Sequence, residues 1–111
     1  MNPRRVHELM RQHFPDVEAA ACTWVVVADD LGLRAGVLND LLETHVPVGD
    51  LLVEVQRKIG DFLPRQETEL FVARYLGQGD IRISNREFTG FVVVAANGVA
   101  TGWSASIVGA A

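Results

Sequence analysis

The C-terminal part of the chain, from Thr89 to Ala111, contains no charged side chain, and Asn97-Gly98 lies inside it. Asn-Gly favours positive φ at both positions, which is the geometry of the two-residue type I′ turn that joins hairpin strands. The sequence therefore predicts a β-hairpin here. An uncharged strand with an open edge recruits further strands through its free N–H and C=O groups. We therefore expect this hairpin to lie centrally in a sheet, under helices, or in an interface between chains.

Length and composition indicate a single small domain. The chain has 111 residues, 49% of them hydrophobic, which is enough for one core and predicts one domain over residues 1–111. Cys22 is the only cysteine, so an internal disulfide is excluded; with no signal peptide recognised, we expect a cytoplasmic protein. No apolar run approaches the ~20 residues of a membrane helix. Nine of the ten basic residues are arginine, which favours a GC-rich bacterial or phage genome.

The N-terminal part, residues 1–64, carries patterns typical of helices. Asn2 and Pro3 form a helix start, and the apolar spacing after Arg34 predicts a further helix. Between them the chain is ambiguous, because residues 18–22 favour helix whereas Trp24–Val27 favours strand. We assign helix from the length of this segment, and a strand at Trp24–Val27 stays open. The predicted helices cover residues 2–14, 17–31, 34–44 and 51–62.

From Glu67 onwards the apolar residues alternate with a period of two, which predicts an antiparallel meander over residues 67–108. A turn at Gln78-Gly79 would place Tyr75 opposite Arg82 and Phe71 opposite Arg86; we interpret this as an ordinary amphipathic face. A two-residue turn at Asn97-Gly98 would place Trp103 opposite Val92, facing the helices. The predicted fold class is therefore α+β, with about four N-terminal helices packed on a three- or four-stranded antiparallel C-terminal sheet.

The charge distribution suggests a protein partner. The net charge is −4, and residues 16–50 hold seven acidic residues against one arginine. An acidic surface favours a basic partner and argues against nucleic acid. The reverse face of the last hairpin is also apolar, so we expect it to pair with a second copy of the chain or with a partner protein. The predicted partner-binding residues are Asp29, Asp30, Asp40 and Glu43, and the predicted oligomer interface is Phe91, Val93, Ala95 and Ala100.

These observations predict a small non-enzymatic protein-interaction module that forms a homodimer. It would be an adaptor, an immunity or inhibitor-type protein, or a factor like a secretion chaperone. We predict no catalytic residues, no metal and no cofactor, because the histidines lack metal spacing and no residue set forms a triad.

Two alternatives come from other classes of protein. Ala28 and Gly32, with Leu31, Leu33, Leu38 and Leu41 at core offsets, resemble a helix-turn-helix whose first helix is Trp24–Leu31. That resemblance implies a DNA-binding regulator whose recognition helix is Arg34–Thr44. Its DNA contacts would be Arg4, Arg5, Arg11, Arg34 and Asn39. The second alternative is a small-molecule binder with a pocket between sheet and helices, which a deep pocket holding His45, Cys22 or Asp30 would favour.

Overall fold

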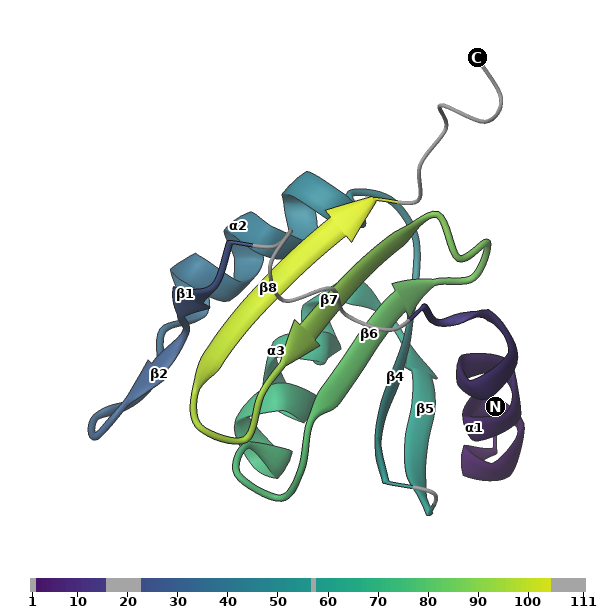
Figure 1. Cartoon of the computed structure of the whole chain (residues 1–111), viewed down its shortest axis with the longest axis horizontal. Helices are drawn as coiled ribbons and strands as arrows, with labels where there is room; N and C mark the ends of the chain where they lie inside the picture. The colour runs from purple at the N-terminus through teal and green to yellow at the C-terminus, as the bar shows by residue number, and fades with distance from the viewer. Residues whose placement is uncertain (1, 16–22, 57, 105–111) are drawn as a thin grey trace.

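The computed structural model describes residues 2–15, 23–56 and 58–104, which form three helices and an antiparallel sheet of six strands (Figure 1). The predicted α+β class is confirmed, although the counts differ from four helices and three or four strands. The helices are α1 (Pro3–His13), α2 (Ala35–His45) and α3 (Arg65–Tyr75). The strands are β1 (Val25–Val26), β2 (Ala28–Asp29), β3 (Gly32–Leu33), β4 (Leu51–Gln56), β5 (Ile59–Leu63), β6 (Ile81–Asn85), β7 (Gly90–Val94) and β8 (Val99–Ser104). In the described part of the chain, no helix has the length and apolar character needed to cross a membrane.

The main sheet has the strand order β1-β8-β7-β6-β4-β5, and all neighbouring pairs are antiparallel. The uncharged hairpin β7–β8 therefore lies inside the sheet, between β6 and β1. Strands β2 and β3 form a separate small hairpin that projects from the body of the molecule (Figure 1). The two edges of the sheet differ, because β1 has only two residues and β5 has five.

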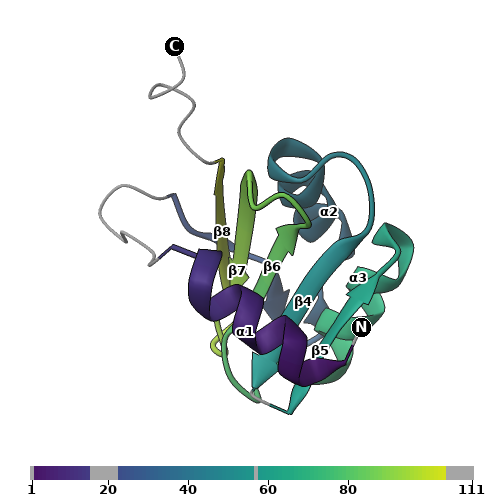
Figure 2. The ribbon, with the colours of Figure 1, turned by 90° about the vertical axis from the view of Figure 1, so that its right-hand side faces the viewer.

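Helices cover both faces of the sheet, with α2 and α3 on one face and α1 on the other (Figure 2). Alternation along β4 sends Leu51, Val53 and Val55 into the core under α2 and α3, and Leu52 into the core under α1. The buried residues of the larger core are Val27, Leu38, Leu42, Val46, Leu51, Val53, Val55, Val72, Ile81, Ile83, Val92, Val94 and Ala100. Those of the smaller core are Val6, Leu9, Met10 and Leu52.

The structure confirms two predicted helices and corrects two other segments. The Asn2 side chain accepts a hydrogen bond of 2.8 Å from the Arg5 N–H and caps α1, and α2 follows Arg34 as predicted. Residues 51–62, predicted as helix, form most of the β4–β5 hairpin instead. Residues 65–75, whose later part was predicted as strand, form α3, so Tyr75 and Phe71 do not face Arg82 and Arg86 across strands. The predicted ends of the sheet at 105–108 and of the second helix at 17–22 lie outside the described residues.

The helix predicted up to Leu31 is wrong over residues 24–31. Val25–Val26 pairs with β8, and Ala28–Asp29 pairs with Gly32–Leu33. The run of β-branched residues in Trp24–Val27 outweighs the length of the segment, because such side chains fit a pleated surface. Strands here remove the first helix of the predicted helix-turn-helix, so that prediction is wrong in its geometry.

The last hairpin forms as predicted, but its register differs by one residue. The Ala95 N–H donates to the Val99 carbonyl at 2.8 Å, so the loop has three residues, Ala96 to Gly98. Gly98 takes a φ of +92°, whereas Asn97 does not take positive φ, as in a type I turn followed by a left-handed glycine. A slip of one residue exchanges the faces of one strand relative to the other. Trp103 therefore lies opposite Phe91 rather than Val92.

The face that carries Phe91 and Trp103 is covered by the end of α1. The Phe14 ring lies 5.1 Å from the Phe91 ring and 5.8 Å from the Trp103 ring, measured between centroids, and both contacts are edge-on. Trp103 thus packs toward α1 and not, as predicted, toward the helices of the other face. The apolar β7–β8 hairpin is therefore covered by α2 on one face and by the end of α1 on the other.

The C-terminal end of α2 rests directly on the backbone of the sheet. A Cβ atom at Gly90 would collide with the His45 carbonyl oxygen, and one at Gly102 would collide with the His45 ring. Two glycines on adjacent strands therefore create the space into which the helix end fits. Close packing buries the His45 ring in part, and this desolvation lowers the pKa of His45 below its usual 6.5.

We expect His45 to make stability depend on pH. Below pH 6.5 the unfolded chain binds a proton at His45 more readily than the folded chain does, so the free energy of unfolding falls as the pH falls through this range. Above pH 6.5 this loss of free energy of unfolding is absent, so the stabilising effect of the neutral, partly buried imidazole is fully present. Urea unfolding between about pH 5 and 7.5 should give a smaller pH dependence for His45→Gln than for the natural protein. Equal slopes for the two proteins would contradict this expectation.

Candidate functional site

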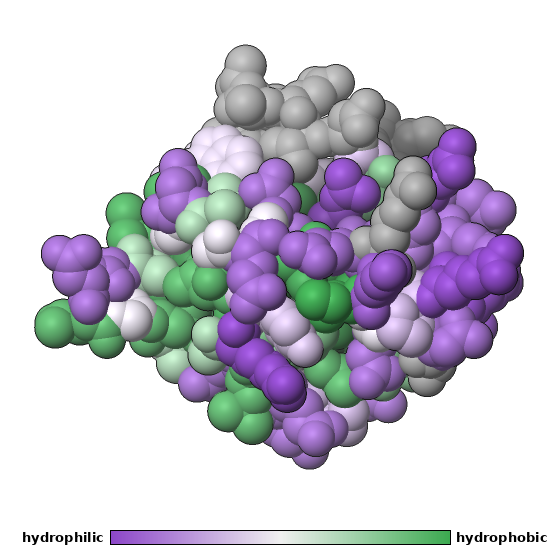
Figure 3. Space-filling view, turned by 90° about the horizontal axis from the view of Figure 1, so that it is seen from below, coloured by the Kyte–Doolittle hydropathy of each residue, from purple (hydrophilic) through white to green (hydrophobic). Residues whose placement is uncertain are grey.

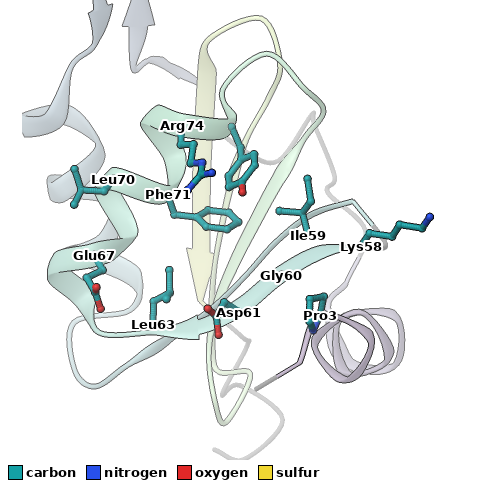
Figure 4. A pocket seen from close by; sticks show the side chains of 11 residues that line it. Pro3, Lys58, Ile59, Gly60, Asp61, Leu63, Glu67, Leu70, Phe71 and Arg74 are labelled. Atoms are coloured by element: carbon teal, nitrogen blue, oxygen red, sulfur yellow. The ribbon is translucent and has the colours of Figure 1, made fainter.

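A groove of about 390 Å³ runs between the edge strand β5 and helix α3 (Figure 4). Strand β5 has β4 as its only neighbour in the described sheet, so its outer side is open. The lining residues are Pro3, Lys58, Ile59, Gly60, Asp61, Leu63, Glu67, Leu70, Phe71, Arg74 and Tyr75. An open strand edge and a side-chain groove thus lie next to each other.

The floor of the groove is apolar because the strand and the helix that form its walls each turn their apolar side chains toward the other. Alternation along β5 sends Ile59 and Leu63 toward α3, and positions four apart on α3 send Phe71 and Tyr75 toward β5. The two rings lie 4.8 Å apart, and Figure 4 shows the Phe71 ring between the helix and β5. At the rim, 69% of Leu70 is exposed, which is high for a large apolar residue. The site therefore offers an apolar surface that the described fold leaves partly open.

The rim carries both signs of charge. The Arg74 guanidinium lies 5.4 Å from the centre of the Tyr75 ring, in a cation–π contact, and Glu67 lies one helical turn from Leu70 and Phe71. Lys58 and Asp61 stand on the β5 side of the groove. A rim of mixed charge suits a polypeptide better than a strongly charged small molecule.

The backbone of β5 shows how its edge is protected. The Phe62 N–H donates to the Asp61 carboxylate at 2.8 Å, so a neighbouring side chain satisfies a backbone donor of the edge strand. Gly60 allows α1 to lie close on the other face, since a Cβ there would stand 3.1 Å from Val6 Cγ1. The groove extends over the edge as far as Pro3 at the start of α1.

The predicted acidic residues lie on two elements. Asp29 and Asp30 belong to the projecting β2–β3 hairpin, and Asp40 and Glu43 are exposed on α2. Asp29 is paired, because Arg34 donates to it at 2.6 and 2.9 Å, and this hydrogen bonding lowers the pKa of Asp29. The acidic surface is therefore weaker than the sequence suggested.

The projecting hairpin also exposes apolar residues. Between its strands, 98% of Leu31 is exposed, and 51% of the neighbouring Val26 is exposed on β1. Hydrophobic residues gather on this side of the molecule, at the left of Figure 3. Sequence reasoning placed Leu31 in a helical core and missed this exposure.

The four residues predicted for an oligomer interface do not share one surface. Phe91 and Val93 face α1, Ala100 lies in the core under α2, and all three are buried within the single chain. Ala95 is half-buried beyond the end of β7. Self-association itself is not tested by these positions and stays a prediction.

The residues predicted for DNA contact are also divided between the two faces. Arg4, Arg5 and Arg11 lie on α1, whereas Arg34 and Asn39 lie at and on α2, beyond the opposite face of the sheet. Arg4 and Arg5 form ion pairs with Glu8. No single described helix surface collects these side chains.

The residues named for a ligand pocket are likewise not brought together. His45 lines a cavity between the loops that follow α2 and β6, Asp30 lies on the β2–β3 hairpin, and Cys22 is outside the described residues. Among residues 2–15, 23–56 and 58–104, no group of three or more histidine, cysteine or acidic residues has the geometry for a metal ion.

Comparison with family models, with curated proteins and with solved structures finds no match for this chain.

Proposed function

We propose that this protein is a protein-interaction module that binds an extended segment of a partner along β5, with side chains of that segment seated against α3. The observation that carries the proposal is the open edge of β5 beside the apolar groove of Phe71 and Tyr75. An added strand hydrogen-bonds to the edge through its main chain, and every second side chain points to the same face. The segment would therefore have apolar residues at alternating positions.

The β5 edge supports this function better than β1 does. Strand β1 has two residues, which is too short to template a partner strand, whereas β5 has five. An incoming strand would also offer the Phe62 N–H a main-chain carbonyl acceptor in place of the Asp61 carboxylate. The exposed acidic residues Asp30, Asp40 and Glu43 would favour a partner with basic residues outside the bound segment. A homodimeric form remains part of the proposal.

Binding should depend on the rim and floor of the groove. We expect peptides selected from a random display library on the natural protein to bind Leu70→Glu and Phe71→Ala at least ~10-fold more weakly, because each change removes apolar contact area. The measurement is fluorescence anisotropy of labelled synthetic peptides. Leu31→Glu is the matched control: it makes the same change at an exposed leucine on the distant β2–β3 hairpin.

Main-chain pairing can be tested separately in the same peptides. N-methylation of successive peptide amides should weaken binding at every second position, because only the amides that face β5 donate to it. Peptides that bind both groove variants and the natural protein equally well would overturn the proposed site. An N-methyl series without alternation would overturn strand addition.

A further inference from the structure

On the opposite face of the sheet, α1 and strands β6 and β7 enclose a pocket of about 290 Å³. One side of α1 supplies its helical wall, through positions three, four and seven residues apart. The lining residues are His7, Met10, Arg11, Phe14, Pro15, Asp80, Arg82 and Val93. Two arginines and a histidine thus share a pocket that is separate from the groove at β5.

A buried carboxylate fixes the histidine of this pocket. Glu54 on β4 is only 5% exposed, and its Oε2 lies 2.9 Å from His7 Nδ1. A carboxylate only accepts hydrogen bonds, so the Nδ1–H of His7 donates to it and holds the ring in one orientation. Nε2 is the remaining polar atom of the ring, and 28% of the His7 side chain stays exposed. The imidazole is therefore oriented and accessible.

The two arginines of the pocket have no carboxylate partner among the described residues. Arg4, Arg5 and Arg34 form ion pairs, but none of the ion pairs in the described part of the chain involves Arg11 or Arg82. Arg82 stands directly opposite Glu54 in the β4–β6 pairing, and its guanidinium lies 5.8 Å from the centre of the Phe14 ring. That contact positions the guanidinium without neutralising it.

We propose that this pocket binds the phosphate group of a small molecule. The guanidinium groups of Arg11 and Arg82 present donors that match phosphate oxygens, and guanidinium–phosphate contacts are charge-assisted. His7 Nε2 accepts from a P–OH group, or donates to a phosphate oxygen when the ring is protonated. Met10, Val93 and the Phe14 ring supply the apolar part of the lining.

Asp80 indicates what the rest of the small molecule carries. Its carboxylate lines the same pocket and accepts a hydrogen bond of 3.3 Å from the Ala96 N–H. A carboxylate repels a bare anion and accepts from a hydroxyl or amino group. The structure therefore favours a phosphate ester with a nearby hydroxyl or amino group over free phosphate.

Inorganic phosphate and glycerol 3-phosphate are the probes. A compound that binds only the folded chain raises its melting temperature by mass action. We expect both probes to raise it relative to chloride at equal ionic strength and pH. Arg82→Gln should raise the dissociation constant of each at least ~10-fold, because it removes a charge-assisted contact. Arg74→Gln is the matched control, since Arg74 is also exposed and also stacked on an aromatic ring, but in the β5 groove.

Asp80→Asn separates the two sources of phosphate. For an ester, glycerol 3-phosphate should bind the natural protein more tightly than inorganic phosphate, and Asp80→Asn should remove this advantage. Equal binding of the two probes, both strengthened by Asp80→Asn, would assign the pocket to free phosphate and overturn the ester. No stabilisation by either probe, or an equal loss in Arg74→Gln and Arg82→Gln, would overturn the site.

Discussion

Replacing Gly90 with alanine is expected to lower the free energy of unfolding by about 3 kcal/mol or more. The added methyl group would meet the His45 carbonyl oxygen and stand 2.9 Å from Val46 Cγ1. The main obstacle is backbone at the end of a helix, so it cannot move aside as a long side chain can. Relief requires α2 to shift on the sheet, and Leu38, Leu42 and Val46 would leave the core with it.

Urea unfolding measures the Gly90 effect, and Gly36→Ala is the control. Gly36 is exposed in α2, and a Cβ there meets no atom within 4 Å. Alanine at this helical position should stabilise the protein by up to about 1 kcal/mol, because glycine has the lower helix propensity. Opposite signs for two glycine-to-alanine changes associated with one helix would show that the packing of α2 on Gly90 is the cause. A Gly90→Ala protein as stable as the natural one would contradict the described packing.

The helices that could be predicted from sequence are the two with a local sequence signal, either a capping residue or a helical spacing of apolar residues. Asn2 and Pro3 specify the start of α1 through local hydrogen bonding and a fixed φ, and the structure shows the Asn2 cap. The spacing of Val37, Leu38, Leu41 and Leu42 likewise predicts α2. These signals act over a few residues and do not depend on the rest of the fold.

The β4–β5 hairpin could not be assigned in the same way, because its apolar residues fit two periods. Strand β4 is buried on both faces of the sheet from Leu51 to Val55, so all of these residues except Glu54 are apolar and do not alternate with exposed polar ones. Such a run suits a helix face equally well when its neighbours are unknown. The register of β7 and β8 was missed for a different reason: Asn97-Gly98 fits both two- and three-residue loops, and the structure contains the longer loop.

The candidate sites could not be predicted because their secondary structure was assigned wrongly and because their residues lie far apart in the sequence. One wall of the groove, β5, lies in a segment predicted as helix, and the other wall, α3, overlaps a segment predicted as strand. Whether a strand lies at the edge of a sheet depends on the order of all its strands, so no local sequence pattern predicts that β5 has one neighbour among the described strands. His7 and Glu54 are 47 positions apart, and each reads alone as an ordinary polar residue. Only packing of α1 on β4 brings the two together.

That packing leads to the second large effect: His7→Leu is expected to destabilise the protein by about 3 kcal/mol. Glu54 is buried, and without the imidazole its carboxylate would face an apolar surface with no partner. Glu54→Leu should cost about 1 kcal/mol or less, because the remaining histidine is partly exposed and can hydrogen-bond to water. The double variant should lie close to the natural protein, since two apolar residues replace both members of the pair.

Urea unfolding of the two single variants and the double variant gives the coupling between His7 and Glu54. We expect it to be about 2 kcal/mol or more, as for a hydrogen bond to a buried carboxylate whose loss leaves that group without a partner. Arg5→Leu and Glu8→Leu are the control, because this pair also involves α1, the helix that carries His7, but its side chains are 54% and 47% exposed. Its coupling should stay below about 0.5 kcal/mol. Additive effects of His7→Leu and Glu54→Leu would mean that the carboxylate is satisfied without the imidazole, and that the orientation of His7 in the phosphate pocket has another origin.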